Sequence, residues 1–180
     1  MPFLPERAIL TYQLRKEMIM DKFKPNHREI TDWIGNQRIT WCGPYSVATV
    51  AGTSYERAYQ TLKMIRGKRH CKGVSNANIA AACKKLGIKG KWKKLEKRTK
   101  LANFLPTLED GKVYIVQITK HVLVIDTRDR TTIDNQHREW IAMESTKHAK
   151  KLAHAYYEVE NPKFETVNEP WLFEKMAASA

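Results

Sequence analysis

The sequence contains no apolar run of about 18 residues, the length that a membrane-spanning helix requires. It has only 8 glycines in 180 residues, and none of them forms the glycine-rich loop that cradles phosphate groups. Acidic residues are also scarce, because 19 Asp and Glu stand against 32 Lys and Arg, which gives a formal net charge of +13. These absences exclude a membrane span and a P-loop nucleotide site, and the positive charge points to an acidic partner.

Cysteine is rare as well, with Cys42, Cys71 and Cys83 as the three copies. An odd number of cysteines, in a chain whose N-terminus has charges where a signal peptide has its apolar region, favours free thiols in a reducing compartment. We therefore expect a cytoplasmic protein, in a host cytoplasm if a virus encodes it. His27 and His70 do not stand at zinc-site spacing from these cysteines, so we expect no metal and no cofactor.

Apolar, β-branched runs over 112–119 and 121–126 predict two core strands, and 131–133 predicts a third. The helical patterns come earlier in the chain. Helices followed by consecutive strands are typical of an α+β domain with a small antiparallel sheet. A chain of this length and with 42% hydrophobic residues is sufficient for one such core.

We divide the chain into an N-terminal helical extension at 1–35, a core at 36–142, and a C-terminal basic helix and tail at 143–180 that pack on the core. The basic helix is predicted over 145–158, and a short strand over 88–94.

The stretch 40–50 places Cys42 at the start of a short apolar segment with helical spacing. Gly43 and Pro44 follow at once, and proline is best tolerated in the first turn of a helix. Cys42 would then lie at the positive end of the helix dipole, beside backbone N–H groups without an intrahelical partner. That environment favours the thiolate, which is the nucleophile. The alternative is a buried cysteine that only packs.

A thiolate nucleophile needs a base, and the base needs an orienting group. His121 stands at the start of a predicted strand, from which its ring can reach the Cys42 helix. Asp134 and Asn135 follow after one hairpin, and the returning strand would bring one of them beside His121. The sequence leaves both open as the orienter, with Asp134 preferred.

Acyl transfer also needs hydrogen-bond donors for the oxyanion. Gln37 lies five residues before Cys42, and its side-chain amide could act together with the Cys42 N–H. Asn36 competes with Gln37 for this role.

In this order the residues resemble the papain-like superfamily, most closely its bacterial branch related to the peptidase domains of bacteriocin-exporting transporters. The resemblance runs from about Asn36 to Asn135 and rests on Gln37, Cys42-Gly43-Pro44, the segment 73–87, the strand at 113–116, His121 and Asp134. It implies a papain-like fold, with the nucleophile helix packed on the sheet.

The resemblance also implies the roles of nucleophile for Cys42, base for His121, orienter for Asp134 and oxyanion donor for Gln37. Two positions depart from the family pattern. The family usually has its glutamine six residues before the cysteine, where this chain has Asn36, and a glycine before its histidine, where this chain has Lys120.

The first hypothesis is a cysteine hydrolase of the thiol protease type, which cleaves a peptide or amide bond in a peptide or protein substrate. The alternative is a catalytically inactive module of the same fold that binds nucleic acid or another polyanion. Its surface would be the basic stretch 89–100, where lysines contact phosphates and a tryptophan stacks on a base. The residues expected to bind there are Lys91, Trp92, Lys93, Lys94, Lys97 and Arg98.

Overall fold

The computed structural model describes residues 22–25, 41–67 and 71–164. Helices come first, and the strands form one antiparallel sheet in the order β1-β6-β2-β3-β4-β5, which confirms the predicted α+β class. The elements are α2 (Cys42–Ala51), α3 (Tyr55–Arg66), α4 (Asn76–Lys85), β1 (Gly90–Lys100), α5 (Leu101–Phe104), η2 (Leu105–Thr107), β2 (Val113–Ile118), β3 (His121–Asp126), β4 (Thr131–Ile133), β5 (Ile141–Ala142), η3 (Met143–Ser145) and β6 (Leu152–Val159). Across these described ranges, no helix has the length and apolar character to cross a bilayer.

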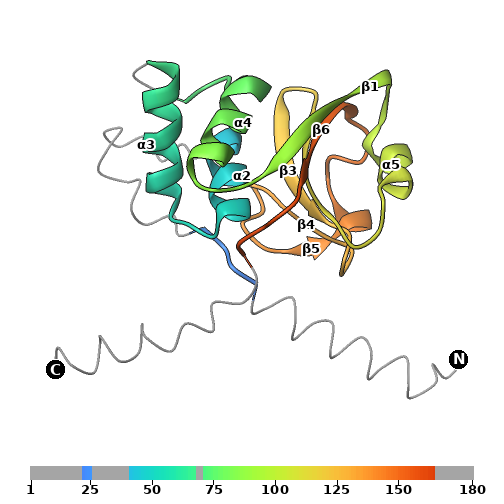
Figure 1. The fold of residues 1–180 in the computed structure, drawn as a ribbon. Helices are drawn as coiled ribbons and strands as arrows, with labels where there is room; N and C mark the ends of the chain where they lie inside the picture. The colour runs from blue at the N-terminus through green and yellow to red at the C-terminus, as the bar shows by residue number, and fades with distance from the viewer. Residues whose placement is uncertain (1–21, 26–40, 68–70, 165–180) are drawn as a thin grey trace, which may run out of the picture.

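The sheet separates two hydrophobic clusters. Helices α2, α3 and α4 lie on one side of the sheet and α5 on the other (Figure 1). Successive side chains of a strand point to opposite faces, and β2 follows this rule. Val113 and Ile115 join the cluster of α2–α4, whereas Tyr114 and Val116 join the cluster that contains Leu101 of α5. Both faces of β2 are therefore buried, which explains its nearly continuous apolar sequence.

Helix α2 begins at Cys42, as the sequence predicts, with Gly43 and Pro44 in its first turn. Every residue after Cys42 in this helix is buried, and the helix packs on β3. The residue before this helix, Trp41, has an extended backbone, and its backbone N–H donates to the Tyr55 hydroxyl at 2.8 Å. The small and apolar residues of 43–51 thus form a buried helix with its amino end at the rim of the core.

Gly52 ends α2 with a φ of 56°, and a methyl group there would meet the backbone carbonyl oxygen of Lys163. The backbone N–H of Lys163 donates to the Val50 carbonyl at 2.9 Å. This bond holds the Lys163 backbone in place, so its carbonyl oxygen cannot easily move away from an added methyl group. We expect Gly52→Ala to lower the free energy of unfolding by about 3 kcal/mol, through positive φ and this contact.

The matched control is Gly67→Ala. Gly67 ends α3 with a φ of 62°, but a methyl group there would meet no atom of the described residues within 4 Å. Gly67→Ala should lower the free energy of unfolding by about 1 kcal/mol, from backbone strain alone. Urea unfolding of both variants gives the comparison, and equal losses would contradict the role of the Lys163 contact.

The predicted basic helix over 145–158 is wrong. This part of the chain is a turn at 146–151 followed by β6. β6 lies between β1 and β2 and pairs with both, so the sheet continues beyond residue 142, where we placed the end of the core. The physical reason lies in the alternation of Ala153, Ala155, Tyr157 and Val159, which are buried while their neighbours are more exposed.

β1 is longer than the strand predicted over 88–94, since it runs to Lys100 and forms one edge of the sheet. Its pairing with β6 is irregular between Lys94 and Thr99. Pro106 lies in η2, directly after the short helix α5, and so limits helical structure there.

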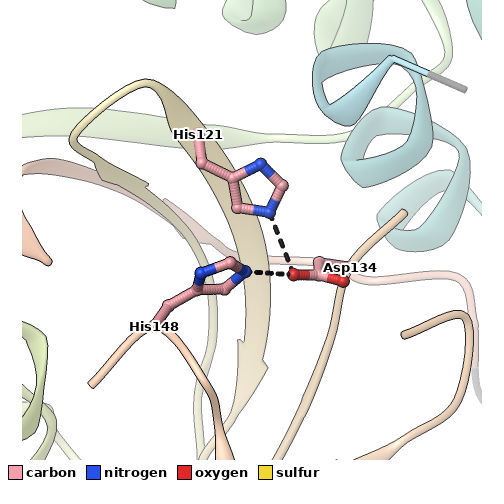
Figure 2. A group of neighbouring side chains, drawn as sticks. All are labelled: His121, Asp134 and His148. Atoms are coloured by element: carbon pink, nitrogen blue, oxygen red, sulfur yellow. Dashed lines mark hydrogen bonds and ion pairs between the residues drawn. The ribbon is translucent and has the colours of Figure 1, made fainter. Parts of the chain in front are cut away.

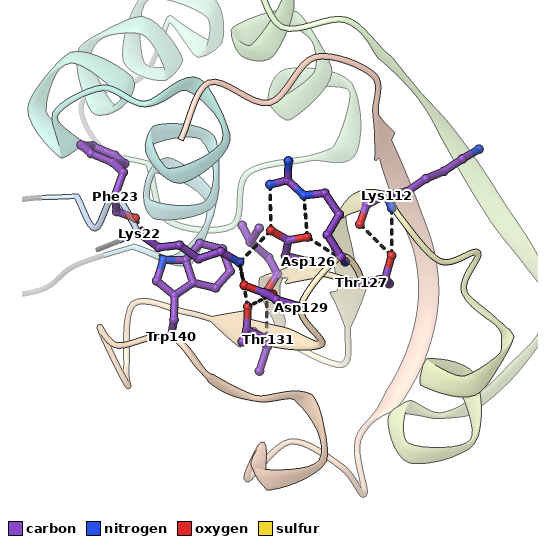
Figure 3. Close-up of polar contacts among 11 residues, drawn as sticks. Lys22, Phe23, Lys112, Asp126, Thr127, Asp129, Thr131 and Trp140 are labelled. Atoms are coloured by element: carbon purple, nitrogen blue, oxygen red, sulfur yellow. Dashed lines mark hydrogen bonds and ion pairs between the residues drawn. The ribbon is translucent and has the colours of Figure 1, made fainter. Parts of the chain in front are cut away.

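Lys22 connects the short described segment 22–25 to the sheet through polar contacts (Figure 3). Its ammonium group bonds the carboxylate of Asp126 at 2.7 Å, pairs with Asp129, and lies 4.3 Å from the centre of a Trp140 ring. The Trp140 indole N–H donates to the Phe23 carbonyl at 3.1 Å. The rest of the predicted extension at 1–35, and the tail after residue 164, lie outside the described residues.

Candidate active site

Cys42 occupies the first position of α2, where the backbone N–H groups of the helix have no intrahelical partner. Burial raises its pKa. The hydrogen bond and charge of His121, together with the backbone N–H groups of Val122 and Gly43, outweigh burial, so the pKa of Cys42 is lowered from the ordinary value of 9.0. The thiol is therefore deprotonated more readily than a free cysteine.

The other two cysteines differ from Cys42 in both exposure and acidity. Cys71 and Cys83 are buried, whereas Cys42 is partly exposed. Burial raises the pKa of Cys71 to about 11 and that of Cys83 to about 12. Cys42 is thus the one cysteine of the three whose surroundings favour the reactive thiolate.

His121 is the first residue of β3, and its ring is buried. Its Nε2 lies 2.9 Å from Oδ2 of Asp134 (Figure 2), which leaves Nδ1 as the ring nitrogen available to the Cys42 thiol. Burial lowers the pKa of His121, but the bonds with Asp134 and Cys42 outweigh it, so this pKa is raised from 6.5. Both shifts favour a thiolate–imidazolium pair.

Lys120, the residue directly before His121, has a φ of 58°. Glycine adopts this region freely, and other residues do so at a cost of about 1 kcal/mol. Lys120 therefore keeps the turn that a glycine would form, and His121 still starts its strand.

Asp134 follows β4, and its side chain rather than that of Asn135 lies beside Nε2 of His121. Its Oδ1 accepts the backbone N–H groups of Gln136 at 2.8 Å and His137 at 2.7 Å. Burial raises the pKa of Asp134, and the hydrogen bonds that it accepts outweigh burial by far, holding the pKa well below its usual range. The buried carboxylate is therefore ionised and fixed in orientation.

A second histidine, which the sequence did not indicate, also contacts this carboxylate. Nε2 of His148 lies 2.6 Å from Oδ2 of Asp134, and Figure 2 shows both histidine rings directed at the same oxygen. The centres of the two rings are 4.6 Å apart. His148 stands among lysines in a segment read as a basic helix, so no local pattern marked it as buried.

His121, Asp134 and His148 present atoms of the kind that bind metals, all within 4.8 Å of one another. Their separations of 2.9 and 2.6 Å are hydrogen-bond distances. They are shorter than the separation of about 3.3 Å that ligands have around a tetrahedral zinc ion. The three side chains therefore form a hydrogen-bonded network in this arrangement.

Gln37 and its competitor Asn36 lie outside the described residues. Trp92 is half-buried and packs on Tyr157, with ring centres 5.6 Å apart, so its ring is part of the core rather than a free stacking platform.

The basic side chains predicted to bind a polyanion project from the edge strand β1, where Lys93 pairs with Glu158 at 2.6 Å. Polyanion binding stays a prediction. The exposed members of the set are Lys91, Lys93, Lys94, Lys97 and Arg98.

Two comparisons, with protein-family models and with curated proteins, return no match. Among solved structures, the chain is similar to the peptidase domain of Streptococcus ComA, described as a bifunctional ABC transporter involved in a quorum-sensing pathway. The two share 17% sequence identity, with a TM-score of 0.45, over 79% of this chain and 99% of that one.

Proposed function

We propose that this chain is a cysteine hydrolase that cleaves a peptide or amide bond in a peptide or protein substrate. The observation that carries the proposal is the 2.9 Å hydrogen bond between His121 and Asp134, together with the interaction of His121 with Cys42 that shifts the pKa of both groups. The lowered pKa of Cys42 and the raised pKa of His121 both favour the charges that nucleophilic catalysis by a thiol requires.

In the proposed reaction, the Cys42 thiolate attacks the carbonyl carbon of the substrate and forms a carbon–sulfur bond. The backbone N–H of Cys42 at the start of α2 stabilises the oxyanion, with Gln37 or Asn36 as the second donor. The His121 imidazolium then gives its proton to the leaving nitrogen as the carbon–nitrogen bond breaks, which leaves a thioester.

Water completes the cycle. His121, now neutral, takes a proton from a water molecule, and the oxygen attacks the thioester carbonyl. The carbon–sulfur bond breaks, the acid product leaves, and the thiolate–imidazolium pair is restored. Asp134 accepts a hydrogen bond from Nε2 of His121 throughout and so keeps Nδ1 directed at the sulfur.

The test is cleavage of a peptide library by the full chain, read by mass spectrometry. We expect defined products from the wild type and none from Cys42→Ala. The matched control is Cys83→Ala, which removes a buried thiol of raised pKa and should preserve cleavage in whatever fraction stays folded. Cleavage that persists in Cys42→Ala would contradict the proposal. Absence of cleavage by the wild type would favour the inactive basic module instead.

A further inference from the structure

One oxygen of the Asp134 carboxylate receives two imidazole groups. Nε2 of His121 and Nε2 of His148 lie 2.9 and 2.6 Å from Oδ2. The side chains of His148 and Asp134 are only 3% and 2% exposed, so water does not replace either contact. The shorter of the two bonds is made by the histidine that the proposed reaction does not use.

The backbone around His148 is held independently of the candidate active site. Its N–H lies 3.3 Å from the Thr146 hydroxyl, and its carbonyl accepts the Lys151 N–H at 2.8 Å. The turn at 146–151 is also joined to α5, whose Ala102 N–H donates to the Ala149 carbonyl at 3.0 Å. The His148 ring is thus presented to Asp134 by a turn fixed on the side of the sheet opposite α2.

The protonation state of His148 follows from its neighbours. His121, His137 and Lys151 are the groups around it that carry or can carry positive charge, and Asp134 is the negative one. Burial, together with the charges of His121 and Lys151, outweighs the attraction of Asp134 and lowers the pKa of His148 from 6.5. At neutral pH His148 is therefore a neutral imidazole, which can donate to Oδ2 only if Nε2 carries its proton.

We propose that His148 is a positioning residue for the Cys42–His121 pair: its Nε2–H holds Oδ2 of Asp134 in the plane and direction that His121 needs. This inference rests on the proposed function. Two backbone N–H groups fix Oδ1, and His148 fixes the second oxygen without adding a positive charge that would compete with the His121 imidazolium. Outer hydrogen-bond partners of this kind orient a functional histidine through its first partner.

Two substitutions separate the hydrogen bond from the ring. His148→Phe keeps an aromatic ring and removes the donor, whereas His148→Gln keeps an N–H donor. We expect His148→Phe to lower kcat by about tenfold to a hundredfold with little change in KM, because the His148 side chain is buried and acts through Asp134. We expect His148→Gln to stay within about threefold of the wild type. His154→Phe, at a half-exposed histidine on β6 that bonds Thr119, is the control and should change neither constant.

The pH dependence of Cys42 alkylation by iodoacetamide gives a second measurement that needs no substrate. His148→Phe should move it towards higher pH, and His148→Gln should leave it near that of the wild type. An unchanged profile in His148→Phe, or equal losses in both variants, would overturn the inference. A shifted profile without any substrate cleavage would leave the positioning role intact and count against the hydrolase.

Nitrogen NMR of the wild type tests the same inference without a substitution, should His148→Phe fail to fold. At pH 7 we expect His148 as the neutral Nε2–H tautomer. A His148 ring protonated on both nitrogens, or protonated only on Nδ1, would overturn the inference.

Discussion

Replacing His121 by alanine is expected to reduce turnover by at least about 10³-fold, because the chain loses both the acid for the leaving group and the cation beside the thiolate. The sulfur itself should become less reactive. Without its imidazolium, Cys42 keeps the burial that raises its pKa and loses the main groups that lower it. An ordinary thiol of pKa 9.0 is only about 0.3% thiolate at pH 6.5, so alkylation of Cys42 at that pH should slow by up to about 300-fold.

The pH dependence gives this prediction its sign. In the wild type the pKa of Cys42 is lowered from 9.0, so the thiolate forms at a lower pH than in a free thiol. The pKa of His121 is raised from 6.5, so the imidazolium persists to a higher pH than in a free histidine. Turnover should therefore rise as Cys42 loses its proton and fall as His121 loses its own. In His121→Ala the rise in alkylation should move to higher pH.

Cys71 and Cys83 provide the internal comparison, since the pKa values of about 11 and 12 predict slow alkylation in the wild type and in the variant alike. The modified cysteine is identified by mass spectrometry after digestion. If Cys42 reacted with the same pH dependence in both proteins, His121 would not be the group that stabilises its thiolate.

The parts of the site that local sequence determines were predictable. Pro44 restricts where a helix can start, and this places Cys42 at its amino end. Two β-branched runs separated by Thr119 and Lys120 define the β2–β3 hairpin, and the returning β4 then brings Asp134 to His121. The step from His121 to Asp134 spans one hairpin, so spacing along the chain was enough to predict it. The approach of Cys42 to His121 depends instead on the packing of α2 on β3, between parts of the chain that are far apart in sequence.

The contact of His148 with Asp134 depends on the packing of parts of the chain that are distant in sequence. His148 reaches Asp134 because β6 enters the sheet between β1 and β2, and the turn before β6 must then cross the end of β4. The turn was predicted as an exposed face of a basic helix because it contains Lys147, Lys150 and Lys151. The alternation that marks β6 starts only at Ala153, after these lysines. The order of strands in the sheet depends on packing across the whole domain, so a local sequence pattern does not predict it.

Replacing Asp134 by asparagine is expected to lower turnover by about 10²–10⁴-fold, the range for loss of an orienting carboxylate or outer-sphere partner. The carboxylate accepts hydrogen bonds from His121 and His148 on one oxygen, and an asparagine must turn either its oxygen or its amide group towards both rings. The amide group would oppose two N–H donors, and the oxygen would lack the charge that stabilises the His121 imidazolium. The pKa of His121 should therefore fall, and the pair with Cys42 should weaken.

The same substitution should lower the free energy of unfolding by about 2–4 kcal/mol at neutral pH, since it leaves buried groups poorly paired. The pKa of Asp134 is lowered in the folded chain, so its contribution to stability is complete above the unfolded value near 3.8 and is lost as pH falls below it. The difference between wild type and Asp134→Asn in urea unfolding should decrease over that acidic range. Asn135→Ala is the control, and it should retain turnover within about tenfold. A greater loss of turnover in Asn135→Ala than in Asp134→Asn would show that Asn135 orients His121, because loss of the orienting residue leaves the His121 ring without a fixed direction.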